Sequence, residues 1–515
     1  MSSGHSTPLQ PSAPAATPAP AQSPPPAVIA AAGRALLSDP CWLPQDLGAP
    51  MPDSRHAASA CLPLWQHNLQ YEEGDPAVVS RLQAAYPRFC LHPTIRQLIT
   101  QTLGPDRCGL IFPTAAAADR AVSYVQHRGG QQPQRHPLPG QTAVALETSQ
   151  EDFSRLKEYW QHAGEILSSR AAELILAGQP PRVSETPARC TVRQRVASYG
   201  GCAASDVWLF PCGMAAIAAI YRTIRRLDPL RPTVQFGFPY VDTLKIQQRF
   251  APNAHHFLPF GDAGDLQRLT ELLTRESISA VFCEVPANPL LTCPDLHALR
   301  QLADQHGFLL IVDDTLSAIV NENPLGYSDL CVTSLTKYFS GYGDVLAGSA
   351  RLNPQSHHAT RLRETLMQEF EEQLCDADCD VLERNSRDLP ERMAVINSTT
   401  AELVRRLRQH PAVARVYYPP ERPAGGGRGG LFSLLLKHPD ATVPATFDRL
   451  RVCKGPNLGT RFTLCCPYTI LAHYTELDEV ERCGVSRWLL RVSVGIEPLE
   501  DLWDRFLKAL PHDHS

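Results

Sequence analysis

Residues 308–314 read Phe-Leu-Leu-Ile-Val-Asp-Asp, a continuous apolar run that ends in two carboxylates. Amphipathic helical patterns, for example at 213–226 and 264–275, separate this run from others like it. Those other runs are Val207-Trp-Leu-Phe, Thr233-Val-Gln-Phe-Gly-Phe, Ala280-Val-Phe-Cys-Glu-Val and Asp329-Leu-Cys-Val-Thr-Ser. Fully apolar strands that alternate with helices are typical of a mainly parallel sheet covered on both faces. We therefore predict a large α/β domain over residues 151–355.

The pattern changes after residue 355. Charged helical patterns at 360–383 and 391–410 precede the strand-like run Leu431-Phe-Ser-Leu-Leu-Leu. We predict a smaller α+β domain over residues 356–515.

The sequence before residue 151 divides into two parts. Residues 1–55 begin with a stretch rich in Pro, Ala and Ser that cannot bury enough apolar surface to offset chain entropy, so we predict disorder there. Residues 56–150 read as an accessory region of unassigned role. Amphipathic patterns predict one helix over 77–103 and another over 151–178, and 131–137 reads as a polar loop.

Composition narrows the function classes. The net charge of −5 over 515 residues gives no reason to expect nucleic acid as a partner. No apolar run reaches the roughly 20 residues that cross a bilayer, and the N-terminus lacks the pattern of a secretion signal. The 16 cysteines are scattered, without paired Cys-x-x-Cys spacing, so we expect reduced thiols, a cytoplasmic protein and no metal site.

Two chemically suggestive residues directly follow predicted strands, where parallel sheets bind ligands. Lys337, in Ser334-Leu-Thr-Lys337, has hydroxyl residues before it and glycines after it, which suits an amine that bonds a carbonyl group beside a phosphate. Asp313 could keep a pyridine nitrogen protonated. A solvated lysine at the start of a loop and an aspartate in a turn or helix cap remain the alternatives.

Two further places follow strands in the same way. Cys212-Gly213-Met214 opens a predicted helix whose backbone N–H groups could bind a phosphate, or it forms a plain strand-to-helix turn. Tyr240 could stack on a flat heteroaromatic ring, or it packs in the core.

The order and spacing of these segments resemble the Cys/Met-metabolism group of pyridoxal-phosphate enzymes, over roughly residues 155–510. The matching motifs are Cys212-Gly-Met-Ala, Glu284-Val-Pro-Ala-Asn288-Pro, Val312-Asp313-Asp-Thr, Ser334-Leu-Thr-Lys337 and Arg491-Val-Ser-Val-Gly. Within this family, the stretches 236–245, 454–464 and 160–170 resemble the fungal type of cystathionine gamma-synthase. The resemblance implies the fold type I, aspartate-aminotransferase-like architecture of pyridoxal-phosphate-dependent transferases.

The resemblance also implies roles for individual residues. Lys337 would bind pyridoxal 5'-phosphate and then move protons on the substrate, Asp313 would pair with the pyridine nitrogen, and Tyr240 would stack on the ring. Arg491 and Asn457 would bind the substrate. The other implied cofactor contacts are Gly213, Met214, Asn288, Ser334, Thr336 and Arg170.

This chain departs from the family pattern near the substrate. It carries Cys212 where the family has a small hydroxyl residue, Asn457 where many members have serine, and Leu316-Ser-Ala where the fungal type reads Ile-Gly-Asn. The family's Tyr-Ser-Arg arm, through which a neighbouring subunit reaches the phosphate, has no evident counterpart, and Arg170 is the candidate that replaces it.

The implied activity is γ-replacement on an O-acylhomoserine with L-cysteine, giving L-cystathionine in trans-sulfuration and methionine biosynthesis (an EC 2.5.1-type transferase). The alternatives are addition of another nucleophile to a vinylglycine intermediate in specialised metabolism, a cystathionine lyase, and a non-catalytic relative. The substrates would be small amino acids, and the resemblance implies a homodimer or homotetramer.

Overall fold

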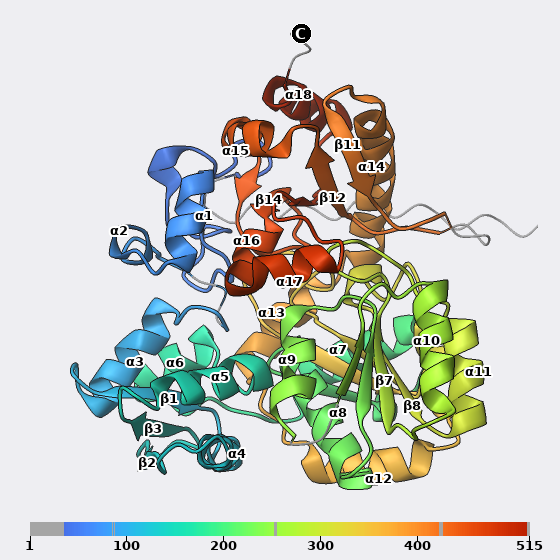
Figure 1. Ribbon diagram of the computed structural model, residues 1–515. Coiled ribbons are helices and arrows are strands. Elements are labelled where there is room, and N and C mark those ends of the chain that lie inside the picture. The colour runs from blue at the N-terminus through green and yellow to red at the C-terminus, as the bar shows by residue number, and fades with distance from the viewer. Residues whose placement is uncertain (1–34, 85, 87, 252–254, 422–425, 512–515) are drawn as a thin grey trace, which may run out of the picture. The chain divides into compact units, whose positions relative to one another are not determined.

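The fold is organised around three β-sheets (Figure 1). A computed structural model describes residues 35–84, 86, 88–251, 255–421 and 426–511. The residues from Arg34 onward form one compact unit. The expected disorder of residues 1–34 lies outside the described residues.

The central sheet has seven strands, of which all but β10 run parallel. In spatial order they are β4 (Val207–Phe210), β10 (Gly348–Leu352), β9 (Leu330–Thr333), β8 (Leu309–Asp313), β7 (Ala280–Glu284), β5 (Thr233–Phe236) and β6 (His255–Leu258). All five predicted apolar runs are strands of this sheet. The mainly parallel α/β architecture predicted from them is confirmed.

Helices cover both faces of the central sheet, which explains why its strands are apolar on both sides. One face packs against α8 (Gly213–Leu227) and α12 (Ala359–Glu369). The other packs against α10 (Ala263–Leu273) and α11 (Leu296–His306), with α7 (Pro187–Gly200) and α13 (Asp376–Asn385) beside β4. The helix α9 (Val241–Arg249) follows β5.

A second sheet of five strands lies in the C-terminal part of the chain. Its order is β11 (Val413–Tyr417), β12 (Leu431–Leu436), β15 (Leu490–Ser493), β14 (Leu464–Pro467) and β13 (Cys453–Lys454), antiparallel except for the last pair. The accompanying helices are α14 (Leu389–Gln409), α15 (Pro439–Arg449), α16 (Tyr468–His473), α17 (Leu477–Arg482) and α18 (Leu499–Ala509). Because the two sheets draw on separate stretches of chain, we propose a domain boundary near residue 355.

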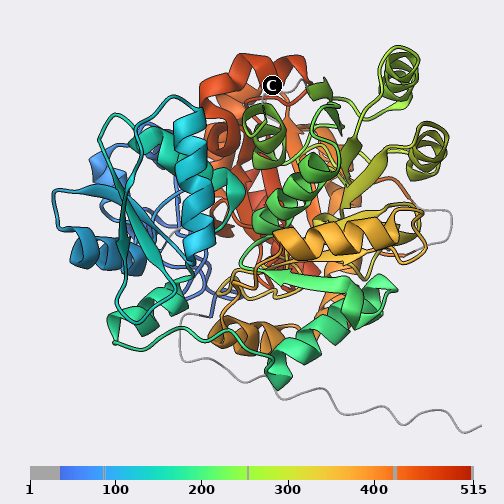
Figure 2. The same cartoon turned by 90° about the horizontal axis from the view of Figure 1, so that it is seen from below.

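A third, antiparallel sheet precedes the central one in the chain, in the order β1 (Cys108–Phe112), β3 (Val144–Thr148), β2 (Gln134–Pro137). Figure 2 shows these N-terminal elements, coloured blue to cyan, beside the central sheet. The helices of this part are α1 (Trp65–Glu72), α2 (Pro76–Val79), α3 (Pro93–Leu103), α4 (Ala115–His127), α5 (Phe153–Ala163) and α6 (Ser169–Leu176). The strand β2 stands in the stretch 131–137, where a polar loop was expected.

Three expected helices are interrupted. In place of the single helix expected over 77–103, the structure has two shorter helices, α2 and α3. The prolines at 87 and 93 each lack the N–H that a helix interior needs, so one continuous helix is not favoured across them. The helix expected over 151–178 breaks after α5 at Gly164, whose φ of 67° ends it in the left-handed conformation. The helix expected over 360–383 divides into α12 and α13.

Residues 35–55 are ordered, contrary to the expected disorder of 1–55. Leu36, Cys41 and Met51 are buried against Phe462 and Leu464 of the C-terminal part. The apolar residues of this stretch are therefore part of a hydrophobic cluster shared with the C-terminal part of the chain. All 16 cysteines are free thiols, and among the described residues no helix is long and apolar enough to cross a membrane.

Candidate active site

One large cavity, of about 910 Å³, lies at the carboxyl ends of the central parallel strands. It gathers eight of the residues predicted from sequence: Gly213, Met214, Tyr240, Asn288, Asp313, Ser334, Lys337 and Arg491. These residues come from both the central sheet and the five-stranded sheet. The cavity is therefore built where the two parts of the chain meet.

Lys337 follows β9 and is 8% exposed. Its Nζ donates a hydrogen bond of 2.6 Å to Oδ1 of Asn457 and lies 4.3 Å from the ring centroid of Tyr86. Burial lowers the pKa of Lys337 below its ordinary value, against an opposing effect of Tyr86, which favours the ammonium. A lysine whose pKa is lowered by burial is suited to bonding a carbonyl carbon.

Asp313 ends β8 and is the register partner of Glu284, which ends β7. Burial raises the pKa of both carboxyls, and like charges add to this effect: Asp313 raises the pKa of Glu284, and Asp314 raises the pKa of Asp313. Among the described residues neither carboxyl has an ion-pair partner, although Thr315 N donates to Asp313 and the backbone of Tyr240 and Asn288 donates to Glu284. A cation beside Asp313 would keep its carboxyl ionised.

The other end of the cavity is suited to an anion. Gly213 begins α8, a helix whose N-cap residue Cys212 makes no side-chain cap, and the N-terminus of a helix favours a bound anion. A Cβ at position 213 would lie 2.9 Å from Cβ of Ser334, which explains the glycine. The thiol of Cys212, which stands where the family has a hydroxyl, donates to the carbonyl of Gly164 at 3.2 Å.

Arg491 approaches the cavity from β15. Its Nη2 donates to the carbonyl of Pro456 at 2.5 Å, and its Nη1 lies 3.4 Å from Oδ1 of Asn288. The guanidinium lies 4.8 Å from the ring centroid of Tyr468, whose hydroxyl accepts from Nδ2 of Asn288 at 3.1 Å. Among the described residues Arg491 has no carboxylate partner, so it is placed to bind one from a ligand.

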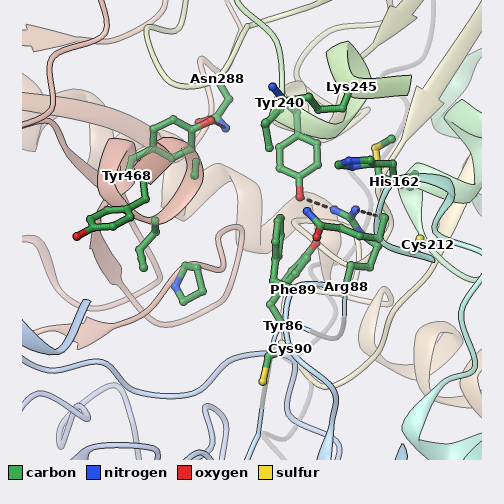
Figure 3. A pocket seen from close by; sticks show the side chains of 18 of the residues that line it. Tyr86, Arg88, Phe89, Cys90, His162, Cys212, Tyr240, Lys245, Asn288 and Tyr468 are labelled. Carbon is green, nitrogen blue, oxygen red and sulfur yellow. Dashed lines mark hydrogen bonds between the residues drawn. The ribbon is translucent and has the colours of Figure 1, made fainter. Parts of the chain in front are cut away.

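Two residues of this cavity were missed by sequence reasoning. Tyr86 and Arg88 lie between α2 and α3, inside the stretch expected to be helical. Arg88 donates to the Tyr240 hydroxyl, to Asp242 and to the carbonyl of Gln161. Figure 3 shows Arg88 beside the Tyr240 hydroxyl, with His162 and Cys212 near it. The signal was the spacing Tyr86-Pro-Arg88, which matches the family's Tyr-Ser-Arg with proline in place of serine.

Two predicted cofactor residues, Thr336 and Arg170, are not brought to the cavity, and the predicted substrate-binding residue Asn457 reaches it indirectly. The hydroxyl of Thr336 is occupied by the backbone of Ala347, to which it donates and from which it accepts. Arg170, on α6, pairs with Asp344 and Asp378. Asn457 reaches the site through its bond to Lys337.

These groups fit pyridoxal phosphate, the cofactor expected from the sequence. An anion fits between the start of α8, Ser334 and Arg88, and a protonated ring nitrogen fits at Asp313. A carbonyl carbon fits at Lys337, and Tyr240 presents its ring to the same cavity. The hydrogen-bonding and charged groups of the cavity are therefore suited to the phosphate, the ring nitrogen and the carbonyl carbon of the cofactor.

Comparison with known proteins agrees with this geometry. The family described as Cys/Met metabolism PLP-dependent enzyme matches residues 182–511. The chain is 33% identical to the cystathionine gamma-synthase of Neurospora crassa, over 91% of this chain and 98% of that protein. It is also 33% identical to the cystathionine gamma-synthase-like protein ankD of Aspergillus thermomutatus, over 90% of this chain and 94% of that protein.

A solved structure shares the fold. The cystathionine gamma synthase from Xanthomonas oryzae pv. oryzae, in complex with cystathionine, superimposes with a TM-score of 0.56 at 24% identity. The match covers 63% of this chain and 85% of that chain, and it identifies fold type I. The chain belongs to the Cys/Met metabolism family of PLP-dependent enzymes, and its cofactor is pyridoxal phosphate.

Proposed function

We propose that the protein catalyses γ-replacement on an O-acylhomoserine, with L-cysteine as the nucleophile and L-cystathionine as the product. In this reaction the Cγ–O bond breaks, a Cγ–S bond forms, and the acyl group leaves as a carboxylate while the thiol proton is released. The relative from Neurospora crassa, named cystathionine gamma-synthase, supports this assignment over nearly the full chain. We further propose a homodimer or homotetramer.

The observation that carries the proposal is that Arg491 and Lys337 converge on the segment Pro456-Asn457. Arg491 donates to the carbonyl of Pro456, and Lys337 donates to the side chain of Asn457. A substrate whose α-carboxylate is held by the planar fork of Arg491 would therefore present its Cα and Cγ near the amine of Lys337.

The residues then have separate tasks. When bound, pyridoxal phosphate supplies the electron-withdrawing ring that makes the Cα proton of the substrate acidic. Asp313 holds the proton on the ring nitrogen. Lys337 takes the proton from Cα, removes a proton from Cβ and returns protons to both carbons after the new bond has formed at Cγ, because a single amine with a lowered pKa can serve as base and acid in turn. Tyr240 and Tyr86 exclude water from one side of the cavity.

A second candidate is addition of a different nucleophile to the same four-carbon unit. The observation that favours it is Asn457, which stands where many family members have serine and binds Lys337 directly. Leu316, another departure from the fungal pattern, lines the cavity. The relative ankD, at the same 33% identity, is named only as cystathionine gamma-synthase-like.

The test is a product assay on the cofactor-loaded protein with O-acetyl-, O-succinyl- or O-phosphohomoserine, with and without cysteine. Cystathionine that forms only with cysteine, and not in Lys337→Ala, is the expected result. Oxobutyrate and ammonia released equally with and without cysteine would contradict the synthase and favour the second candidate. No turnover of any of the three donors would contradict both.

A further inference from the structure

Asp313 and Lys337 reach the cavity from the carboxyl ends of neighbouring strands. β8 ends at Asp313, and β9 ends at Thr333, shortly before Lys337. Thr315, which lines the cavity, joins the two strand ends on that side. Its N–H donates to Oδ1 of Asp313 at 2.8 Å, and its hydroxyl oxygen accepts a hydrogen bond of 2.8 Å from the N–H of Ser334. The relative position of the carboxylate and the amine therefore depends on how these two strand ends are held together.

A second link between the strand ends lies on the far face of the sheet, away from α8. The side chains of a strand alternate between its two faces. Arg351, in β10, lies between Ala350 and Leu352, which are both buried in the cluster that packs against α8. The side chain of Arg351 therefore points to the opposite face. Thr333 follows Val332 of the same cluster and points away from α8 in the same way.

Arg351, Asp314 and Thr333 form one buried cluster on this face, and none of them is more than 1% exposed. Nη2 of Arg351 donates to the carboxylate of Asp314 and, at 3.4 Å, to the hydroxyl oxygen of Thr333. The hydroxyl of Thr333 donates to Oδ1 of Asp314 at 2.5 Å. Because Asp314 directly follows Asp313, a single guanidinium connects the chain after β8 with the last residue of β9.

This cluster is costly for the fold. A Cβ on Gly200, at the end of α7, would lie 2.4 Å from Nη1 of Arg351, so the guanidinium occupies space that a larger residue would fill. Among the described residues Nε and Nη1 of Arg351 have no hydrogen-bond partner, and a buried donor without a partner destabilises a protein. Apolar side chains of similar volume often stabilise a fold as well as a buried ion pair or better. Stability alone therefore does not account for a charged cluster at this position.

The charges of the cluster also act on Asp313. Burial is the largest effect on the pKa of Asp313, which is raised to about 6, and hydrogen bonds from Thr315 oppose it. Asp314 raises this pKa further, whereas the guanidinium of Arg351 lowers it. Because Asp314 and Arg351 act in opposite directions, removing both charges together disturbs the link between the strand ends more than the charge balance at Asp313.

We propose that Arg351, together with Asp314 and Thr333, is a positioning residue that fixes the carboxylate of Asp313 relative to the amine of Lys337 from behind the central sheet. None of the three lines the cavity, so the cluster acts through the two strand ends. A ring that is bonded to Lys337 and paired with Asp313 needs both groups held in a fixed geometry. The inference depends on the cofactor and not on the proposed substrates.

The test removes the ion pair while keeping the protein folded. Arg351→Met combined with Asp314→Asn removes both charges, because loss of one partner alone would leave an uncompensated buried charge. Asparagine can still accept the hydrogen bond from Thr333. The readout is circular dichroism in the visible absorption band of the bound cofactor, per mole of cofactor, which reports how firmly the asymmetric site holds the ring and requires no substrate. Urea unfolding is measured on the same preparation.

We expect the double variant to lose visible ellipticity per mole of bound cofactor. In the product assay its kcat should fall about 10–100-fold with little change in KM, because misplaced reacting groups slow the chemical step more than they weaken binding. Wild-type ellipticity in a folded double variant would overturn the proposal, whatever the product assay gives. If the double variant does not fold, Thr333→Val decides, since it keeps the ion pair and removes only the hydroxyl link to β9. Its ellipticity should fall in the same direction, and a wild-type value would overturn the proposal.

A matched control lies at the other end of the same two strands. Asp329, just before β9, accepts hydrogen bonds from Nη1 of Arg300 at 3.0 Å and from the N–H of Leu310 in β8 at 2.7 Å. Arg300→Met should therefore lower the stability against urea but leave visible ellipticity and kcat at the wild-type level. A loss of ellipticity in Arg300→Met as large as in the double variant would show general loosening of the sheet and contradict a specific role for Arg351.

Discussion

The side-chain oxygen of Asn457 accepts a 2.6 Å hydrogen bond from Nζ of Lys337, 120 residues earlier in the chain. Asn457 is 2% exposed, and among the described residues its Nδ2 has no hydrogen-bond partner. The side chain of Asn457 thus orients the amine of Lys337 through its oxygen, and its buried Nδ2 can donate a hydrogen bond to a ligand. We therefore expect substrate binding and proton transfer to be coupled at this position.

Replacing Asn457 should impair turnover. Asn457→Ala removes a hydrogen bond to a charged group, worth about 1.5–3 kcal/mol, so kcat/KM should fall about 10–100-fold. Asn457→Ser, which restores the family's frequent residue, should retain more activity than the alanine variant. Steady-state kinetics on both variants checks this, and equal kcat/KM in wild type and Asn457→Ala would show that the hydrogen bond has no kinetic role.

Asp313→Asn should separate cofactor binding from catalysis. The amide cannot stabilise a charge on the ring nitrogen, so kcat should fall by about 100-fold or more. Contacts at the start of α8 are unaffected, and cofactor affinity should change much less. Turnover and cofactor content are measured on the same preparation, and near wild-type kcat in this variant would contradict the assigned role.

Arg491→Lys tests the carboxylate site. Lysine keeps the charge but loses the planar fork, so KM for the amino-acid substrate should rise about tenfold or more. Cofactor retention should not change, because Arg491 contacts Asn288 and Pro456 rather than the phosphate end. A variant with unchanged KM would place the substrate carboxylate elsewhere.

Glu476 should make stability depend on pH. Hydrogen bonds from His473 and Lys245 lower the pKa of Glu476 to about 2, below its ordinary value of 4.5. Because the folded pKa is the lower one, the contribution is complete above the unfolded pKa and is lost as pH falls through the folded pKa.

The measurement is urea unfolding of wild type and Glu476→Gln across acid pH. Wild type should be the more stable protein near neutral pH, and the difference should shrink as pH falls from about 4.5 towards 2. A difference that stays constant over this range would show that ionisation of Glu476 does not stabilise the fold.

The strands were predictable because each is defined locally. A run such as Leu309–Asp313 is apolar on both faces, and only a buried parallel strand uses such a run in this context. The chemically important residues follow these strands directly, so their approach to one cavity follows from the sheet. Lys337, Asp313, Tyr240 and Gly213 were found in this way.

The cavity residues Tyr86 and Arg88, between α2 and α3, could not be recognised from the local sequence pattern, because a helix-like apolar periodicity extends across them. The apolar spacing over 77–103 is that of one helix, but the two prolines within it cannot supply the N–H groups that a helix interior needs. The contacts of Arg88 also join residues that are far apart in the sequence, since Arg88 and Asp242 are separated by 154 residues. No local pattern encodes such a pairing.

The sequence by itself determined the family, the cofactor and the residues at the strand ends, because short motifs specify local backbone and functional groups together. Only the tertiary structure decided which side chains remain available to the cavity. Thr336 is bound by Ala347 and Arg170 by Asp344 and Asp378, whereas Arg88 reaches Tyr240 from the N-terminal region. The physical reason is that hydrogen bonds and ion pairs between distant segments form only once packing brings those segments together.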